Sequence, residues 1–215
     1  MKNILIFMIE KYQKHISPWL KNKNIDCKFY PTCSEYTKQA IEKYGGSIVF
    51  VSDDDCWEDI LEKLEEVEGI LLPGGDDVGP WDYSLIQYAL DHQLKLLGIC
   101  QGMQSMALCG TSHSLVAIGN SSHYAKKEYL HDVSLKEGSR IQKLLGRSLL
   151  HVNSYHYQTV ADSFLFSVVG RSEDGLIEVV ENSNHKFQIG VQWHPERMID
   201  YDLASQKLLD SFIRL

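Results

Sequence analysis

The chain has 215 residues, of which 44% are hydrophobic and 23% are charged, so it is long and apolar enough to bury a core of its own. No apolar run approaches the roughly 18 residues that a membrane-spanning helix needs. Five scattered cysteines without a signal peptide argue against a secreted, disulfide-bonded protein, and the net charge of −8 argues against a nucleic-acid partner. We therefore expect a globular cytoplasmic protein.

The charge is unevenly distributed along the chain. Residues 1–45 carry eight lysines and four acidic residues, whereas the rest of the chain is strongly acidic. A basic start of this kind either contacts an anionic membrane surface, through residues 1–20, or forms a solvated lysine face. Composition leaves both interpretations open.

From about residue 34 onward, helix-like and strand-like segments alternate, which is typical of βαβ units and a mostly parallel sheet. The first predicted helix has Ser34 and Glu35 at its start and ends at Gly45 and Gly46. The segments that follow are a strand at 47–51, a helix at 54–69, a strand at 70–75, a helix at 83–93, a strand at 94–100 and a helix from 101.

The second half of the chain has a different pattern. Short β-rich runs separated by turn residues predict strands and hairpins, and an amphipathic helix is expected at residues 201–215. The pattern as a whole predicts an α/β fold with helices flanking the sheet. The β-rich runs are 149–160, 166–175, 176–186 and 187–196.

Cys100 stands out because Gly98 and Gly102 flank it at a predicted strand-to-helix junction. Small neighbours permit the strained turn of a nucleophile elbow, and the N-terminus of the following helix favours a thiolate over a thiol. The alternative is a buried core cysteine, which is what we expect of Cys109. Cys27 and Cys33, separated by five residues, are expected to be unpaired thiols.

A thiol nucleophile needs a base, and the base needs an orienting group. Of the nine histidines, His194 alone follows an apolar strand and has a carboxylate, Glu196, two residues on. The histidines and cysteines show no spacing typical of metal ligands, so we expect neither a metal site nor a cofactor. The glycine pair at 74–75 lets backbone N–H groups approach a ligand, and Gly75 with Gln101 would form an oxyanion hole.

Residues 36–215 resemble the class I glutamine amidotransferase family, and within it the γ-glutamyl-γ-aminobutyrate hydrolase branch, the C26 peptidase-like proteins. The motifs that carry the resemblance occur in the family's order: "AIEKYGGSIVFV", "GILLPGGDDVGP", "LLGICQGMQ", "EGSRIQKLLG", "VNSYHYQTV", "EDGLIEVVE" and "GVQWHPER". The resemblance implies a doubly wound, flavodoxin-like sheet and hydrolysis of γ-glutamyl amides through a thioester.

By the same resemblance, each site residue takes a role. Cys100 would be the nucleophile, His194 the base and Glu196 the orienting acid of a catalytic triad. The substrate would be bound by Gly74, Gln104, Ser154, Tyr155 and His156.

The start of the chain resembles a different family, the membrane protein insertion efficiency factors, through "YQKHISP" and "CKFYPTCSEY". In that family the start is an amphipathic helix at the inner face of the membrane. An amidotransferase sheet instead needs a strand before its first helix, and we favour "KNILIFM" as that strand because a gap would expose two sheet edges. We therefore divide the chain into an atypical segment, 1–33, and a hydrolase domain, 34–215.

Three functions remain open. The favoured one is a cysteine-dependent hydrolase of small γ-glutamyl compounds, because no synthase domain is attached. The second is a glutaminase subunit that passes ammonia to a separate synthase. The third is a non-catalytic protein peripheral to the inner membrane. The sequence does not decide between a homodimer and a synthase partner.

Overall fold

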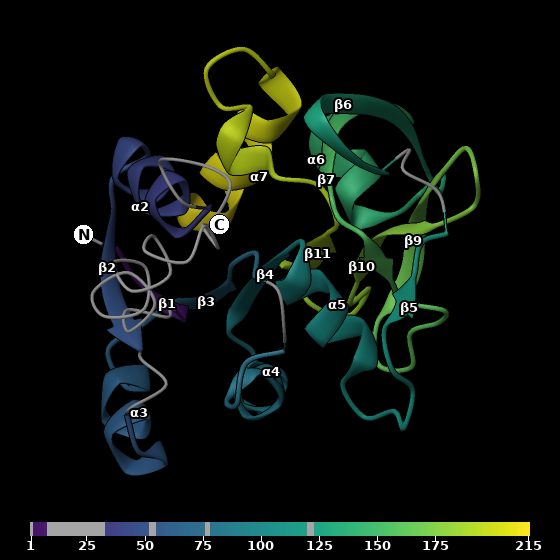
Figure 1. Cartoon of the computed structure of the whole chain (residues 1–215). Helices are drawn as coiled ribbons and strands as arrows, with labels where there is room; N and C mark the ends of the chain where they lie inside the picture. Colours follow the sequence, from purple (N-terminus) through teal and green to yellow (C-terminus); the bar gives the residue numbers. More distant parts are fainter. Residues whose placement is uncertain (1, 8–32, 52–54, 76–77, 120–122) are drawn as a thin grey trace, which may run out of the picture.

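The computed structural model describes residues 2–7, 33–51, 55–75, 78–119 and 123–215, with side chains from residue 36 onward except those of 124–129 (Figure 1). Nine of the described strands form one sheet in the order β2-β1-β3-β4-β11-β10-β9-β6-β7. Helices cover both faces of this sheet, so the predicted α/β class is confirmed.

The first half of the sheet is parallel. The alternation of helix-like and strand-like segments predicted βαβ units in this part of the chain. Its strands, in sheet order, are β2 (Gly46–Val51), β1 (Lys2–Phe7), β3 (Gly69–Leu72), β4 (Lys95–Ile99) and β11 (Gln188–Val191).

The second half of the sheet is antiparallel and contains the predicted hairpins. It also contains the long strand β6, which the sequence analysis did not predict, because "AKKE" interrupts the apolar alternation near its start. These strands are β10 (Ile177–Glu181), β9 (Ser167–Ser172), β6 (Tyr124–Leu135) and β7 (Leu149–Tyr155); β5 (Val116–Ala117) and β8 (Gln158–Thr159) form a separate pair.

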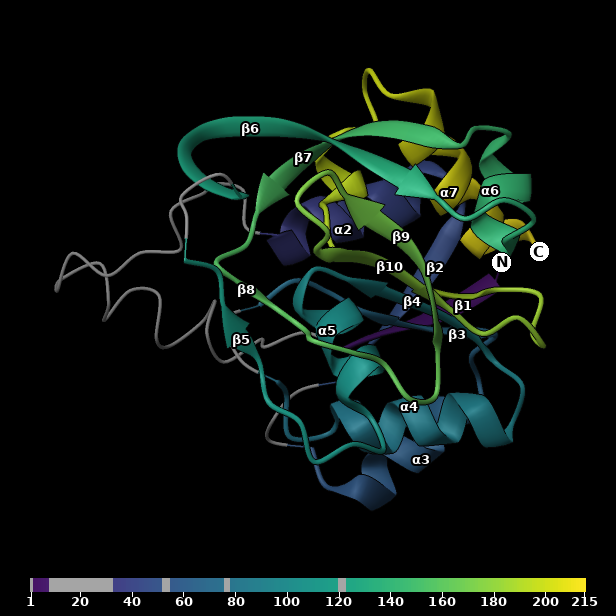
Figure 2. The same cartoon turned by 90° about the vertical axis from the view of Figure 1, so that its right-hand side faces the viewer.

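Two apolar layers hold the helices to the sheet, as Figure 2 shows from the side. Alternate residues of β4 point to opposite layers: Leu97 and Ile99 to one, Leu96 to the other. Each fully buried side chain of this size contributes roughly 1.5–3 kcal/mol. One layer packs α2 (Cys33–Lys43), α6 (Arg140–Leu145) and α7 (Leu203–Arg214); the other packs α3 (Trp57–Leu64), α4 (Asp82–Asp91) and α5 (Gln101–Leu108).

The start of the chain supplies a strand of the sheet. β1 lies between β2 and β3 and is parallel to both, with Ile4 opposite Ile48 on one side and Gly69 on the other. The strand interpretation therefore holds for residues 2–7, and the helical alternative is wrong there. Residues 8–32, with most of the basic segment, lie outside the described residues, so the proposed boundary at residue 33 stays a prediction.

None of the helices in the described part of the chain has the length and apolarity that crossing a membrane requires.

Replacing Leu5 by proline tests the placement of β1. Leu5 pairs with Val49 and Ile70, so proline there removes a ladder hydrogen bond from an inner strand and should cost about 3 kcal/mol or more of unfolding free energy. Leu5→Val, which suits a strand, should cost less than about 1.5 kcal/mol. Urea unfolding measures both values, and equal losses would contradict the placement.

Candidate active site

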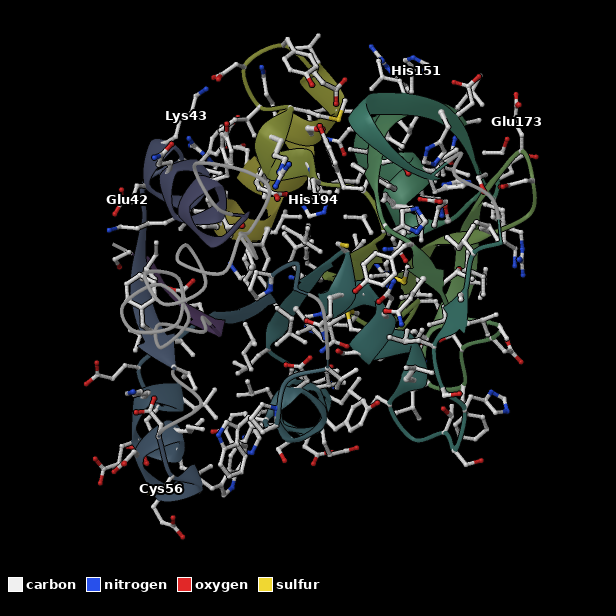
Figure 3. All side chains as sticks on the ribbon, in the orientation of Figure 1. Glu42, Lys43, Cys56, His151, Glu173 and His194 are labelled. Atoms are coloured by element: carbon white, nitrogen blue, oxygen red, sulfur yellow. The ribbon has the colours of Figure 1, made fainter. Side chains whose placement is uncertain are left out.

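Three neighbouring parallel strands end at the same edge of the sheet. Because β3, β4 and β11 are adjacent, the residues that follow them come together although they are far apart in sequence. These residues are Gly74 after β3, Cys100 after β4 and His194 after β11. Ligands of open α/β sheets bind at this carboxyl edge. Figure 3 shows His194 inside the molecule, whereas Cys56 and His151 lie at its outside.

Cys100 has the backbone conformation of a nucleophile elbow. It links the end of β4 to the start of α5 with φ 52° and ψ −106°, a left-handed conformation that is costly for a residue with a side chain. Its amide donates to Val191 O at 2.8 Å, which fixes the turn against β11. The residue is 7% exposed, so Cys100 lies at the edge of the core.

The flanking glycines are required by close backbone contacts. A Cβ on Gly102 would lie 2.1 Å from Leu72 O, and one on Gly98 would lie 2.7 Å from Gly102 C and O. Because backbone cannot move aside as a flexible side chain can, any larger residue would push α5 away from β3 and β4. The G-x-C-x-G pattern therefore has a steric cause.

His194 and Glu196 form a buried hydrogen-bonded pair. Nδ1 of His194 lies 2.7 Å from Oε1 of Glu196, and both residues are at most 3% exposed. Since a carboxylate oxygen accepts, Nδ1 carries the hydrogen and a neutral imidazole has its lone pair on Nε2. That is the tautomer a general base needs.

The backbone of His194 is held from the neighbouring strand β7. Asn153 donates from Nδ2 to His194 O at 2.9 Å and accepts from His194 N–H at its Oδ1 at 2.8 Å. The Tyr155 ring stands edge-on to the imidazole, with 5.7 Å between centroids. The predicted substrate residue Tyr155 thus contacts the candidate base directly.

Gly74 brings the base and the nucleophile together. A Cβ built on Gly74 would lie 2.7 Å from His194 Cε1 and 3.4 Å from Cys100 Cβ. Both side chains therefore pack against this glycine. Gly75 is exposed beside it, and the Gln101 N–H belongs to the first turn of α5, where no intrahelical acceptor exists. The oxyanion pair stays a prediction.

A row of amide side chains reaches the sulfur. Gln192 donates from Nε2 to Cys100 Sγ at 3.6 Å, and its Oε1 accepts from Gln104 Nε2 at 3.1 Å. Gln104 also donates to Gln158 O at 3.0 Å. These contacts hold the Gln192 amide against the sulfur. Gln104 was expected from the sequence and Gln192 was not, although Gln192 lies only two residues before the base.

The substrate role expected of Ser154 and His156 stays a prediction, and the structure gives these side chains other partners. The Gln101 side-chain amide donates to Asp82, whereas its expected role concerns the backbone N–H. Ser154 Oγ donates to His123 O at 3.0 Å, and the His156 ring lies beside His123 and Glu178. The structure therefore places Ser154 and His156 in a second buried cluster, for which the sequence offered no spacing signal.

Burial shifts the pKa of two further groups, His123 and Cys109. Desolvation lowers the pKa of His123, and a hydrogen bond to Asp174 opposes that effect. Desolvation raises the pKa of the Cys109 thiol, so this cysteine, which follows α5 directly, favours the unreactive thiol form. The packing role expected of Cys109 agrees with its burial.

Comparison with known proteins identifies the family of the chain. A family model described as Peptidase C26 matches residues 80–196, more than half of the chain. A second, described as "Putative membrane protein insertion efficiency factor", matches residues 1–51. The γ-glutamyl-γ-aminobutyrate hydrolase of Escherichia coli O157:H7 is 30% identical over 216 residues, with 85% of each chain covered.

Other relatives are longer than this chain. The CTP synthase of Bartonella bacilliformis is 30% identical over 183 residues, which cover 65% of this chain and 33% of that protein. The chain spans 56% of the length of a Mycobacterium tuberculosis relative. Among solved structures, the glutaminase domain of Trypanosoma brucei CTPS, with acivicin bound, superposes with a TM-score of 0.68 at 16% identity, covering 98% of this chain and 92% of that one. The structural match shows the shared fold.

Alkylation of Cys100 tests whether His194 acts on its sulfur. At pH 7 the His194→Ala variant should react with iodoacetamide at least about tenfold more slowly at Cys100, because the thiol loses the base that accepts its proton. Peptide mass spectrometry gives the rate for each cysteine. The exposed Cys56 serves as internal control and should react equally in both proteins. An unchanged rate at Cys100 would argue that the two side chains do not interact.

Proposed function

We propose a function from the premise that this chain belongs to the Peptidase C26 family and is a glutamine amidotransferase-like hydrolase acting on amide bonds. The proposed reaction is hydrolysis of the γ-glutamyl amide bond of small molecules such as γ-glutamyl-γ-aminobutyrate. The observation that carries it is the left-handed Cys100 at the end of β4, packed on the same glycine as the His194–Glu196 pair.

In the first step the Cys100 sulfur attacks the γ-carbonyl carbon of the substrate. His194 takes the thiol proton at Nε2 and returns it to the leaving amine, while Glu196 holds the imidazolium in place. The C–N bond breaks, the amine leaves, and a glutamyl thioester remains on Cys100. The negative charge that develops on the carbonyl oxygen would be stabilised by the N–H groups of Gly75 and Gln101.

In the second step water hydrolyses the thioester. His194 removes a proton from the water, the carbon–sulfur bond breaks, and glutamate is released with the thiol restored. Gln192 would assist both steps, since its N–H faces the sulfur and can hold it in position as it attacks and as it leaves. Asn153 would keep the base aligned throughout.

Replacing the candidate nucleophile tests the reaction. Cys100→Ala should lower kcat for glutamate release from γ-glutamyl-γ-aminobutyrate by at least about 10³-fold, because the thioester cannot form. The matched control is Cys109→Ala, which removes a nearby buried thiol and should stay within about threefold of the wild type. Glutamate is measured by a coupled assay. Activity retained in Cys100→Ala would refute the proposal.

A second candidate is a glutaminase that delivers ammonia to a synthase. It is favoured by the match to a CTP synthase, of which this chain corresponds to one third. Both candidates use the same triad and differ in the acceptor of the released amine. Membrane contact through residues 1–20 stays a prediction, because most of those residues lie outside the described part of the chain.

Affinity purification from the source cell distinguishes the two candidates. A glutaminase subunit should co-purify with a synthase in stoichiometric amount, and that partner should raise glutamine hydrolysis about tenfold or more, as expected when partner contacts complete an active site. A free hydrolase should work at full rate alone and prefer γ-glutamyl-γ-aminobutyrate to glutamine. Isolation without a partner, at full activity, would exclude the synthase role.

A further inference from the structure

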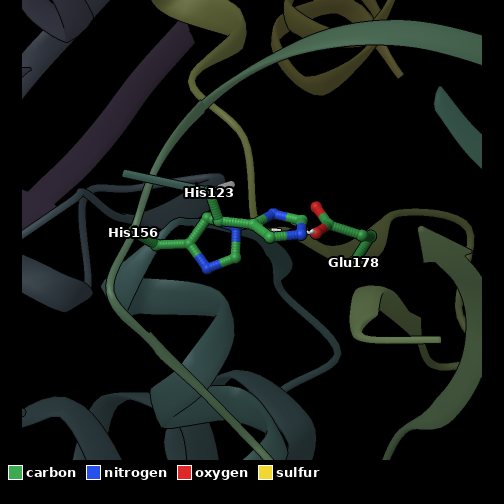
Figure 4. Close-up of side chains that lie close together, drawn as sticks. All are labelled: His123, His156 and Glu178. Carbon is green, nitrogen blue, oxygen red and sulfur yellow. Dashed lines mark hydrogen bonds and ion pairs between the residues drawn. The ribbon is translucent and has the colours of Figure 1, made fainter. Parts of the chain in front are cut away.

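A second buried cluster lies beside the candidate active site. His123 comes just before β6, His156 just after β7, and Glu178 lies on β10 (Figure 4). One potential ligand atom from each residue falls within 4.8 Å of the other two. The three residues are at most 3% exposed, and Glu178 is fully buried. None of them takes part in the proposed reaction.

The outer contacts of the two histidines fix where their hydrogens lie. His156 Nδ1 is 3.0 Å from Gln158 O, and His123 Nε2 is 3.0 Å from a carboxylate oxygen of Asp174. Both oxygens only accept, so each of these nitrogens carries a hydrogen. In the neutral rings the opposite nitrogens, His123 Nδ1 and His156 Nε2, therefore present lone pairs toward each other and toward Glu178.

This arrangement places three electron-rich atoms together in the interior. The distances are 3.2 Å between the two ring nitrogens, 3.5 Å from His156 Nε2 to Glu178 Oε1 and 3.8 Å from His123 Nδ1 to the same oxygen. Within the described part of the chain, the fully buried Glu178 carboxylate is approached by histidine ring nitrogens at 3.3–3.8 Å and by no lysine or arginine. A buried carboxylate facing two lone pairs is costly unless a cation lies between them.

We propose that His123, His156 and Glu178 bind one divalent transition-metal ion of the zinc class. Zinc is bound tetrahedrally at about 2.0–2.1 Å by nitrogen and oxygen, so two ligand atoms of one ion lie roughly 3.3 Å apart. The three distances agree with this spacing to within about half an ångström. Two imidazoles and a carboxylate are also a ligand set that zinc commonly uses.

The surroundings of the cluster also suit a metal site. Hydrogen bonds from a ligand's second ring nitrogen to a carboxylate or carbonyl orient metal-binding histidines, and both histidines have one. His131 Nε2 lies 3.3 Å from Glu178 Oε1 and holds the carboxylate from the other side. Ser154 Oγ lies 3.2 Å from His123 Nδ1, so a polar oxygen also borders the cluster.

The bound ion would have a structural role. It would tie the segment before β6, the end of β7 and strand β10 to one point. β7 also carries Asn153, which holds the backbone of His194. No redox change is needed, since the two ring nitrogens already present lone pairs and the ion exchanges bound water for the three ligand atoms.

Metal titration of the full-length protein tests the proposal. Protein stripped with a chelator should bind one Zn²⁺ per chain by calorimetry, retain it through gel filtration in elemental analysis, and gain thermal stability. Co²⁺ should give visible bands of a four-coordinate nitrogen and oxygen site without a strong thiolate charge-transfer band. The same titration on Cys100→Ser protein should give the same stoichiometry, because that thiol is not a ligand.

Variants identify the site, each beside a matched control. His156→Ala and Glu178→Gln should abolish stoichiometric zinc binding. Asp174→Asn, which removes only the negative charge of an outer contact near the surface, should weaken zinc binding by about 10–100-fold. This variant tests the proposal even if a ligand variant fails to fold. The controls are His151→Ala and Asp132→Asn, which change an exposed histidine–aspartate pair on β7 and β6 and should leave the affinity unchanged.

The proposal is overturned if the wild type binds no zinc in stoichiometric amount. It is also overturned if Asp174→Asn and Asp132→Asn bind zinc equally well, or if the cobalt spectrum is that of a thiolate site. Each of these results leaves the cysteine hydrolase mechanism untouched, because none of the three metal ligands belongs to its triad.

Discussion

The contact between α5 and the strands beneath it is the constraint on which the site depends. With Gly102 directly on the carbonyl of Leu72, the chain must turn sharply after β4, and the turn forces Cys100 into its left-handed conformation. The cost of that conformation, about 1–3 kcal/mol, is offset by the apolar layers on both sides of the sheet. This turn sets the position of the sulfur. The neighbouring strands β3 and β11 bring Gly74 and His194 close to it.

Local features of the sequence predicted much of this site. Glycines two residues to either side of Cys100 indicated the turn, and the two-residue spacing of His194 and Glu196 indicated their hydrogen bond, which the structure contains. Asn153 and Gln192 could not be found in the same way. Their partners are main-chain groups or a sulfur that only the pairing of distant strands brings near.

Two larger features were also not predicted from the sequence: the cluster of His123, His156 and Glu178, and strand β6. His123, His156 and Glu178 lie on separate elements, so no regular spacing relates them along the chain, although the antiparallel half of the sheet places them together. β6 was missed because polar residues interrupt its start. By contrast, strand β1 was predicted from the sheet as a whole, because a missing inner strand would expose two sheet edges. The structure places β1 between β2 and β3.

The strand order has a consequence for how the protein is made. β1 pairs with both β2 and β3, and the three strands are close in sequence except for the connection before α2, so this part of the sheet can assemble while the rest is still being synthesised. β11 is the last strand to leave the ribosome, yet it must insert between β4 and β10, next to a sulfur whose partner Gln192 lies 92 positions away. A nascent chain therefore carries its thiol long before it carries a base, and the reactive pair forms only when the fold closes.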